Sequence, residues 1–406
     1  MSRLEELIAE LCPDGVEYKH LSAIATVSRG GSFQKKDFVE AGVPCIHYGQ
    51  IYTSYGLFTD KTLTFIPAAI AEKQKYAEPG DIVMAVTSEN MEDVCKCIGW
   101  LGDDRVAVSG HTAIIHHNQD TKYLVYYFHT EAFQAQKKKL AHGTKVIEVT
   151  PDTLNSVSIP VPPLPIQREI VRILDTFTEL TAELTAELEK RRVQYECYKN
   201  SLLKFDDDVH IASLGEICEV VSGGTPSKKN KGFWNRGTVK WLASSVCKNM
   251  KTVDEVTEYI TEEGLYNSSA KIMKVGTTLI ALVGATIGKT AFLPFEAAIN
   301  QNVAGIFPKN TSEVDPSYVY YACTLLYPQF LTLSKGKLAM ANMSFVRNLK
   351  IPVPPLKTQR RIISILDRFD ALCNDLTSGL PAEIAARQKQ YEYYRDKLLT
   401  FKEKTA

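Results

Sequence analysis

The chain repeats a segment of its own sequence, and this repeat restricts its fold more than any other feature. The hexapeptide Ile-Pro-Val-Pro-Pro-Leu occupies residues 159–164 and returns unchanged at residues 351–356, an offset of 192. At the same offset, Gln-Arg at residues 167–168 returns at residues 359–360. Because chance does not supply several matches in one order, the sequence predicts two copies of one architectural plan.

The identities continue beyond these positions. Ile-Leu-Asp at residues 173–175 returns at 365–367, and Gln-Tyr-Glu at residues 194–196 returns at 390–392 with an offset of 196. Leu-Leu-x-Phe follows both Gln-Tyr-Glu copies. The change of offset from 192 to 196 means that the second copy contains four additional residues.

Each copy predicts an extended lead-in followed by a long helix. Its three prolines fix φ and prevent the helix from extending backwards. The apolar residues that follow recur every three or four positions, which is the stripe of a two-helix coiled coil. These stripes are Ile170, Ile173, Leu174, Phe177, Leu180, Leu184 and Leu188, and then Ile362, Ile365, Leu366, Phe369, Leu372, Leu376 and Leu380. We expect a first helix over residues 167–205, about 60 Å long, and a second helix interrupted near Gly379 and Pro381.

The segments before the two copies predict mixed α/β domains with short strands. Gly30-Gly31 in the first segment corresponds to Gly223-Gly224 in the second. Apolar runs at residues 81–86 and 278–283 predict buried strands, and residues 123–133 and 318–331 predict short helices. The expected fold class is α+β, with two mixed α/β domains separated by an antiparallel coiled coil of two long helices in a pseudo-twofold repeat. The expected boundaries are 1–158, 159–205, 206–350 and 351–406.

Composition indicates an ordinary globular protein of the cytoplasm. The chain is 45% hydrophobic and 23% charged, has no apolar run of about 18 residues, and lacks an apolar signal segment at its start. Its nine cysteines are an odd, scattered set, which favours reduced thiols. We interpret the closest pair, Cys95 and Cys97, as structural because Cys-x-Cys alone is a poor zinc signal.

Charge does not by itself indicate a nucleic-acid partner. The chain has 47 basic and 47 acidic residues, which excludes attraction by the molecule as a whole but permits a local basic surface. Residues 1–158 contain 15 basic and 20 acidic side chains, whereas residues 206–350 contain 15 and 13. Residues 351–406 contain 10 and 7.

The motifs for catalysis are incomplete. Residues 283–290 approach a phosphate-binding loop, but Gly-x-x-x-x-Gly-Lys needs glycine where Val283 stands. Asp14 and Glu17 lie too close together to share a metal from separate strands, and His111 has no partner at metal-ligand spacing. The Asn-Pro-Pro-Tyr type of loop, which an adenine methyltransferase needs, does not occur in the sequence. The sequence therefore predicts no catalytic site and no metal site.

At this point the residues resemble a known family over essentially the full chain, the specificity subunits of type I restriction-modification systems. The resemblance rests on the twin Ile-Pro-Val-Pro-Pro-Leu-x-x-Gln-Arg openings and the Gln-Tyr-Glu-x-Tyr…Leu-Leu-x-Phe helix ends. Residues 214–217, 223–227 and 284–289 are also typical of the family's recognition domains. The first domain departs from this pattern at residues 30–33 and 87–90, so its contact residues are harder to assign.

The resemblance implies a binding subunit without catalytic activity. Such a subunit binds two copies of a DNA adenine methyltransferase subunit and, in the full complex, two motor-nuclease subunits. Each recognition domain reads one half of a split target in double-stranded DNA. The resemblance also implies that the subunit itself takes no cofactor, neither S-adenosylmethionine nor ATP.

A tandem tetrapeptide in the first helix indicates how the spacer between the half-sites is set. Thr181-Ala182-Glu183-Leu184 is followed at once by Thr185-Ala186-Glu187-Leu188. Four residues add about 6 Å of rise and about 40° of excess rotation, whereas one DNA base pair turns by about 34°. One tetrapeptide thus nearly preserves the angular match while changing the spacer by about one base pair. A variable repeat count is characteristic of the type IC branch that the chain resembles; a chance duplication in an amphipathic helix is the alternative.

Polar side chains in and near glycine-rich loops are the candidates for DNA contact, because the backbone approaches phosphates closely there. Asn and Gln pair with adenine, and Lys or Arg with guanine. In the first domain the candidates are Ser32, Gln34, Lys35, Lys36, Ser88, Asn90, Ser109, His111, Thr144 and Lys145. In the second domain they are Thr225, Ser227, Lys228, Lys229, Thr286, Lys289, Asn300, Gln301, Asn302, Lys335 and Lys337.

Two alternatives remain open at this stage. Tyr195, Tyr198, Tyr391 and Tyr394 near the helix ends either dock the methyltransferase or pack within the coiled coil. The rival functional classes are a self-sufficient DNA methyltransferase or nuclease, which the missing catalytic motifs oppose, and a structural coiled-coil adaptor, which the large globular segments oppose.

Overall fold

The structure is a computed structural model, and it describes residues 2–205, 208–253, 255–334, 340–375 and 377–404. The chain divides into two compact units. Unit 1 comprises Met1–Glu183 and Ala385–Ala406, and unit 2 comprises Leu184–Ile384. Each unit therefore contains one globular segment together with part of each helical segment.

Unit 1 is built on two larger sheets. The five-stranded sheet contains, in order, β2 (Ala25–Arg29), β11 (Thr112–His117), β7 (Ile82–Ala85), β9 (Cys97–Trp100) and β4 (Phe58–Thr59). The four-stranded sheet contains β5 (Thr64–Ile66), β3 (Val43–Ile46), β10 (Val106–Val108) and β6 (Lys75–Ala77). Two small sheets pair β1 (Tyr18–His20) with β13 (Ser158–Pro160) and β8 (Thr87–Ser88) with β12 (Ile147–Glu148).

The short helices of unit 1 lie between these strands or after them. They are α1 (Arg3–Leu11), α2 (Tyr48–Thr53), α3 (Ala68–Ala71), α4 (Thr121–Tyr127), α5 (Glu131–Leu140) and α6 (Pro151–Leu154). The helix expected over residues 123–133 is thus two helices. They separate because the Thr130 side chain accepts a hydrogen bond from the Phe133 amide at 3.2 Å and begins α5.

Unit 2 has the same strand order as unit 1. Its five-stranded sheet contains β15 (Cys218–Ser222), β23 (Val303–Pro308), β20 (Thr278–Ala281), β21 (Thr290–Phe292) and β17 (Met250–Thr252). Its four-stranded sheet contains β18 (Glu258–Ile260), β16 (Val239–Leu242), β22 (Ala297–Ile299) and β19 (Lys271–Met273). β14 (Ile211–Ser213) pairs with β24 (Lys350–Pro352).

The pairing directions agree strand for strand as well. In the five-stranded sheets three neighbouring pairs are antiparallel, and the last pair, β9 with β4 or β21 with β17, is parallel. In the four-stranded sheets the parallel pair is β10 with β3 or β22 with β16. The internal repeat predicted from the sequence is therefore a repeat of topology.

The helices of unit 2 follow the same plan. They are α8 (Leu214–Ile217), α9 (Glu262–Tyr266), α10 (Pro316–Thr324), α11 (Tyr327–Leu331) and α12 (Met343–Asn348). Residues 318–331, expected as one short helix, are again divided into two. Each of the two apolar runs contains a buried strand, as predicted. These strands are β7 and β20, and both are buried at every position.

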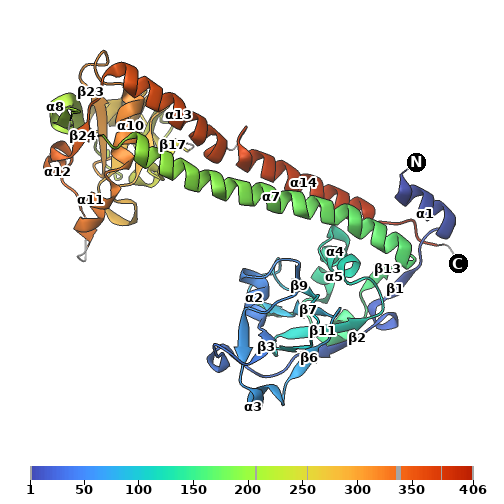
Figure 1. Ribbon diagram of the computed structural model, residues 1–406. Coiled ribbons are helices and arrows are strands. Elements are labelled where there is room, and N and C mark those ends of the chain that lie inside the picture. The colour runs from blue at the N-terminus through green and yellow to red at the C-terminus, as the bar shows by residue number, and fades with distance from the viewer. Residues whose placement is uncertain (1, 206–207, 254, 335–339, 376, 405–406) are drawn as a thin grey trace. The chain divides into compact units, whose positions relative to one another are not determined.

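The two long helical segments differ in continuity. The first forms one helix, α7 (Leu164–Leu202), whereas the second forms α13 (Leu356–Asn374) and α14 (Leu380–Leu398), as Figure 1 shows. The predicted interruption near Gly379 and Pro381 is confirmed. Pro381 lies in the first turn of α14, where a missing amide costs no helical hydrogen bond. The predicted stripe residue Leu376 lies outside the described residues.

A side-chain cap begins the segment that leads into α14. The Asp375 carboxylate accepts hydrogen bonds from the amide and hydroxyl of Thr377, at 2.7 and 2.6 Å, and from those of Ser378. These bonds lower the pKa of Asp375 well below its ordinary value. The cap stabilises the interruption between α13 and α14, because it satisfies amides that an unbroken helix would use internally.

Aromatic and aliphatic side chains join the helices within each unit. In unit 1 the Phe177 ring of α7 stacks on Tyr394 of α14 with centroids 5.4 Å apart. In unit 2 the Tyr195 ring of α7 stacks on Phe369 of α13 at 6.2 Å, and Tyr198 lies 5.3 Å from the same ring. The N-terminal part of α7 therefore contacts α14, and its C-terminal part contacts α13. This is the order of an antiparallel pair. These contacts favour the packing interpretation of the tyrosines.

Both helical copies attach to their globular segment through an aspartate. In unit 1 the Tyr126 hydroxyl donates to Asp175 at 2.7 Å. In unit 2 the Tyr321 hydroxyl donates to Asp367 at 2.5 Å, and Lys251 forms an ion pair with the same carboxylate.

Among the helices that the structure describes, none combines the length and the apolar character that a membrane span requires.

Candidate nucleic-acid interface

The candidate DNA-contacting residues fall in four loops that occupy equivalent places in the two units. The glycine loop follows β2 or β15 and covers residues 30–36 and 223–229. The hairpin loop follows β7 or β20 and covers residues 86–90 and 283–289. The crossover loop connects β10 to β11 or β22 to β23, at residues 109–111 and 300–302, and the closing loop covers residues 142–148 and, as far as it is described, 340–342.

In unit 1 the glycine loop lies against the crossover loop. The Gly31 amide donates to the Val108 carbonyl at 2.7 Å, and the Arg29 Nε donates to the Gly110 carbonyl at 3.0 Å. A β-carbon at Gly30 would lie 2.0 Å from the Ser109 carbonyl oxygen. Close strand packing, rather than a phosphate approaching the backbone, therefore requires the glycine.

The other two loops of unit 1 complete a ring of contacts. The Val86 amide of the hairpin loop donates to the His111 carbonyl of the crossover loop at 3.0 Å. The Val86 carbonyl accepts from the Val149 amide, directly after the closing loop, at 3.0 Å. Glu148 of the closing loop accepts from Arg29, which precedes the glycine loop, at 3.0 Å. Four segments that are distant in the sequence thus form one continuous surface.

Unit 2 brings together the equivalent loops. The Gly224 amide donates to the Ile299 carbonyl at 3.0 Å, and the Thr225 hydroxyl donates to Gln301 Oε1 at 2.6 Å. A β-carbon at Gly223 would lie 1.7 Å from the Ile299 carbonyl oxygen. The same backbone packing therefore explains the second glycine pair.

The hairpin, crossover and closing loops of unit 2 are also in contact. The Leu282 amide donates to the Asn302 carbonyl at 2.8 Å, and the Leu282 carbonyl accepts from the Ala341 amide at 2.8 Å. The candidates Lys335 and Lys337 lie outside the described residues.

Most of the predicted contact residues reach the surface of these loops. Ser32, Gln34, Lys35, Lys36, Asn90, His111, Thr144, Lys145, Ser227, Lys228, Lys229 and Gln301 are exposed. Ser88, Thr225, Thr286, Lys289 and Asn302 are half-buried. They come from separate stretches of the sequence, and within each unit hydrogen bonds bring the loops that carry them into contact.

Two predicted contact residues are buried and need correction. The Ser109 hydroxyl accepts the Tyr48 amide at 2.9 Å, and Asn300 Oδ1 accepts the Asn302 amide at 3.0 Å. Their exposed fractions are 1% and 6%. They occupy the same place in the two crossover loops, where they satisfy backbone amides, so we exclude both from direct contact with DNA.

His47, next to the crossover loop of unit 1, contributes no positive charge at neutral pH. Burial lowers the pKa of His47 to about 4, and the nearby positive charges of Lys35 and His111 act in the same direction. The Tyr48 ring lies between the two imidazoles, 4.5 Å from His47 and 4.9 Å from His111. His47 is therefore neutral at pH 7 and packs as an aromatic residue. The positive charges of the glycine loop include those of Lys35 and Lys36.

Several functional positions were not predicted. The side chain of Gln74 accepts the amides of Ser32 and Phe33, at 2.7 and 3.3 Å, and so holds the glycine loop of unit 1. In unit 2, Trp234 and Glu258 contact Lys228 of the glycine loop. No sequence pattern points to Gln74 or Glu258. Trp234, in contrast, stands in a polar, lysine-rich segment, and this context is a signal that could have indicated it.

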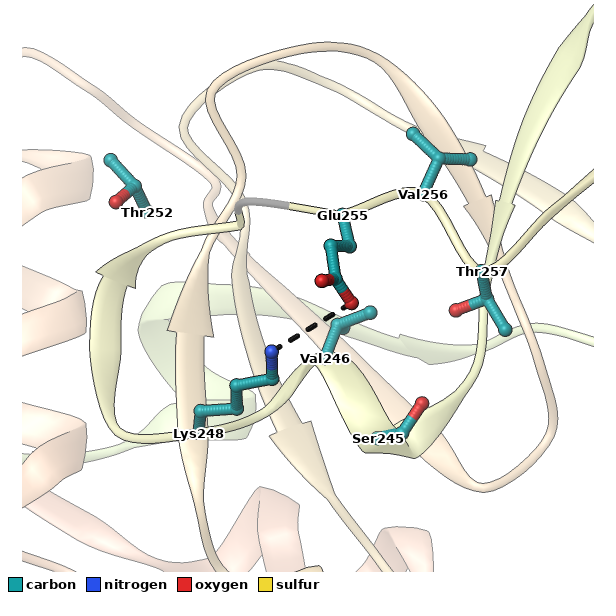
Figure 2. Close-up of a pocket in the computed structure, with 7 residues that line it drawn as sticks. All are labelled: Ser245, Val246, Lys248, Thr252, Glu255, Val256 and Thr257. Carbon is teal, nitrogen blue, oxygen red and sulfur yellow. Dashed lines mark ion pairs between the residues drawn. The ribbon is translucent and has the colours of Figure 1, made fainter. Parts of the chain in front are cut away.

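A cavity in the described part of unit 2 lacks the side chains of a catalytic constellation. Figure 2 shows a cavity of about 250 Å³ in unit 2, where Lys248 and Glu255 form an ion pair with 3.9 Å between Nζ and Oε2. Serine and threonine line this cavity, but none of its described lining residues is a histidine or a cysteine, so no strong nucleophile–base pair forms there. Within the described parts of the chain, no group of histidine, cysteine, aspartate or glutamate has the arrangement of a metal site.

The cysteines are free, as expected. Cys95 and Cys97 are buried in the core of unit 1. Burial raises the pKa of the Cys95 thiol to about 12 and that of Cys97 further. Both thiols are therefore protonated at neutral pH and pack as small apolar side chains, which agrees with their structural interpretation.

Comparison with protein families gives two matches within the chain. The model of the type I restriction modification DNA specificity domain matches residues 13–191 and again residues 206–386. The two matches follow the internal repeat and together cover most of the sequence.

Individual relatives carry related names. The specificity subunit of the type I restriction enzymes EcoR124I/EcoR124II from Escherichia coli is 40% identical over 259 residues, 60% of this chain and 63% of that protein. A putative type I restriction enzyme specificity subunit from Haemophilus influenzae is 33% identical over 275 residues, 64% of this chain and 68% of that protein. The match thus spans less than two thirds of the Escherichia coli relative.

Solved structures share the fold along nearly the whole chain. A chain from a study of complex assembly and conformational transition of the type I R-M system has a TM-score of 0.64 at 19% identity, with 95% of this chain and 97% of that chain covered. The type I restriction-modification S subunit from M. genitalium has a TM-score of 0.55 at 15% identity, with 95% and 96% covered. These likenesses confirm the predicted fold class.

Proposed function

The chain belongs to the family of type I restriction modification DNA specificity domains, and from this premise we propose that it is the DNA sequence-specificity subunit of a type I restriction-modification complex. In this proposal the subunit is non-catalytic and cytoplasmic, and it takes no cofactor. Residues 1–158 and 206–350 are the two target-recognition domains. Each reads one half of a bipartite site in double-stranded DNA.

One observation carries the proposal: the two units share a topology and differ in their loops. In the larger sheets strand order and pairing direction repeat, whereas the glycine loop reads Gly-Gly-Ser-Phe-Gln-Lys-Lys at residues 30–36 and Gly-Gly-Thr-Pro-Ser-Lys-Lys at residues 223–229. A conserved scaffold with divergent surface loops is what a protein needs to read two different short sequences with one architecture.

The loop residues supply the chemistry for both kinds of DNA contact. Lysines such as Lys35, Lys36 and Lys229 are suited to phosphates, which position a protein on the duplex without reading its sequence. Amides such as Gln34 and Gln301 are suited to base edges, because they offer a donor and an acceptor together. We therefore propose the exposed and half-buried candidates as the contact set, without Ser109 and Asn300.

The pseudo-twofold repeat suits two identical partners. Two similar surfaces on one chain present the same binding site twice, which a pair of identical subunits can occupy. We propose that these partners are two DNA adenine methyltransferase subunits, joined in the full complex by two motor-nuclease subunits. The helical segments, residues 159–205 and 351–406, act in this proposal as the spacer between the recognition domains.

A methylation assay tests the proposed function against its rivals. The purified chain, its methyltransferase partner, and both together are incubated with DNA and labelled S-adenosylmethionine. We expect sequence-specific methyl transfer with both together and none with this chain alone. Transfer by the chain alone would identify a self-sufficient methyltransferase, and a partner that methylates the same sites without this chain would contradict the specificity role.

A further inference from the structure

The glycine loop of unit 2 is held in place by two tryptophans. The indole Nε1–H of Trp241 donates to the Gly224 carbonyl at 2.9 Å, and that of Trp234 donates to the Ser227 carbonyl at 3.2 Å. The two rings meet edge to face with their centroids 5.3 Å apart. Because both indoles bond the loop backbone, the loop and the rings form one ordered structure.

This structure orients a lysine and a glutamate side by side. Lys228 Nζ lies 3.4 Å from the centre of the Trp234 ring and forms an ion pair with Glu258 of the neighbouring strand β18. The Lys228 side chain is nevertheless 55% exposed and the Glu258 side chain 42% exposed. An ion pair that is so exposed adds little to folding stability, and both charged groups remain accessible to a ligand from solvent.

The surroundings of the pair are positively charged. A cavity of about 500 Å³ is lined by Lys228 and Glu258 together with Lys231, Trp234, Arg236 and Tyr259, among others. Arg236 has a φ of 58°, a left-handed backbone conformation that is uncommon for a long side chain and frequent at functional sites. Lys231 and Arg236 are exposed, and their charges favour a DNA backbone next to the pair.

Unit 1 has different residues at the equivalent register. Trp241 pairs with Glu258 between β16 and β18, and the corresponding partners between β3 and β5 are Cys45 and Thr64. The scaffold is thus retained, and Lys35 stands in the glycine loop where Lys228 stands in unit 2, whereas the tryptophan and the carboxylate are absent at this place in unit 1. A residue pair that reads a base specific to one half-site is expected to differ in this way.

From these observations we infer that Lys228 and Glu258 together read one guanine–cytosine pair in the half-site of unit 2; this inference rests on the proposed function. In the major groove guanine presents two acceptors, O6 and N7, next to the donor amino group of cytosine N4. The ammonium of Lys228 donates to the guanine acceptors, and the carboxylate of Glu258 accepts from the cytosine amino group. An adenine–thymine pair also offers two acceptors, adenine N7 and thymine O4, but the adenine amino group stands between them and the thymine methyl group lies in the same groove.

The full chain in complex with its methyltransferase partner allows a direct test. Unmethylated genomic DNA is treated with the complex and S-adenosylmethionine, and sequencing of the modified bases gives the recognised motif. In Lys228→Gln and Glu258→Gln variants we expect the preference for G·C at one position of one half-site to fall by about tenfold or more. All other positions of the motif remain as in the wild type.

An exchange of the two charges sharpens the test. A chain with Lys228→Glu and Glu258→Lys together places donor and acceptor in the opposite order, so the preferred pair at that position changes from G·C to C·G. A merely structural ion pair would not reverse a base preference. The conservative Lys228→Arg substitution retains a donor for guanine, and its complex is expected to keep the wild-type motif.

A second ion pair in unit 2 serves as the matched control. Lys248→Gln and Glu255→Gln remove another exposed lysine–glutamate pair, with side chains 49% and 83% exposed, and are expected to leave the motif unchanged. An unaltered motif in the Lys228→Gln, Glu258→Gln and exchange variants would overturn the inference while leaving the proposed function intact. A wild-type complex without a bipartite motif would instead refute the proposed function itself.

Discussion

Two buried glutamines attach the globular segments to the helices in the same way. Gln167 Oε1 accepts the Asp120 amide at 3.0 Å, and Gln359 Oε1 accepts the Asp315 amide at 2.9 Å. Each glutamine also donates to the proline carbonyl five residues earlier, at 2.8 Å. Both are completely buried. This repeated function explains why the glutamine recurs in the two sequence copies.

Removal of one such glutamine is expected to destabilise its unit. Gln167→Ala leaves the half-buried Asp120 amide without this partner, which costs about 1–3 kcal/mol. The loss in the free energy of unfolding is measured by denaturant unfolding of the full chain, followed by an optical signal that reports on unit 1. The control is Gln388→Ala, which removes an exposed glutamine from α14 and is expected to change the free energy of unfolding by less than about 0.5 kcal/mol. Equal effects of the two substitutions would contradict this explanation.

The residues that the sequence analysis identified correctly are those whose reasons are local. Prolines, glycines and apolar spacing act over a few positions, so the helices and the interruption at Pro381 followed from the sequence. The partnership of Lys228 with Glu258 joins residues 30 positions apart through a strand pair, and no local pattern encodes it. Ser109 and Asn300 were misassigned for the same reason, because burial is a property of the folded loops.

The strands show how one topology tolerates two sequences. Outside the repeated helical segments, identities between the two units are sparse, yet every strand of the larger sheets has a counterpart with the same neighbours. Apolar runs predicted the central strands β7 and β20. The short edge strands β4 and β17 contain only Phe58–Thr59 and Met250–Thr252, too few residues for a periodic pattern, and their pairing depends on tertiary contacts.

The tandem tetrapeptide lies within α7 and is expected to set the spacer length. Deletion of residues 185–188 shortens this helix by about one turn and should shorten the spacer of the methylated motif by about one base pair. Both half-site sequences should remain. Sequencing of methylated DNA measures the motif. A Glu187→Gln control keeps the helix length and should leave the spacer unchanged, whereas an unchanged spacer in the deletion variant would favour a chance duplication.

At the scale of the whole molecule, neutrality and DNA binding are compatible because the charges are distributed unevenly. Residues 1–158 have an excess of acidic side chains and residues 351–406 an excess of basic ones. The lysines of the glycine loops concentrate positive charge where the four loops of each unit meet. Net charge alone therefore gave no indication of DNA, which was implied only by the family resemblance that the repeated motifs carry.

The central claim is that each recognition domain reads its own half-site. Replacement of residues 1–158 by the equivalent domain of another family member, followed by sequencing of the DNA that the complex methylates, tests it directly. We expect one half of the methylated motif to change while the other half, read by unit 2, stays the same. A change in both halves, or in neither, would contradict the account.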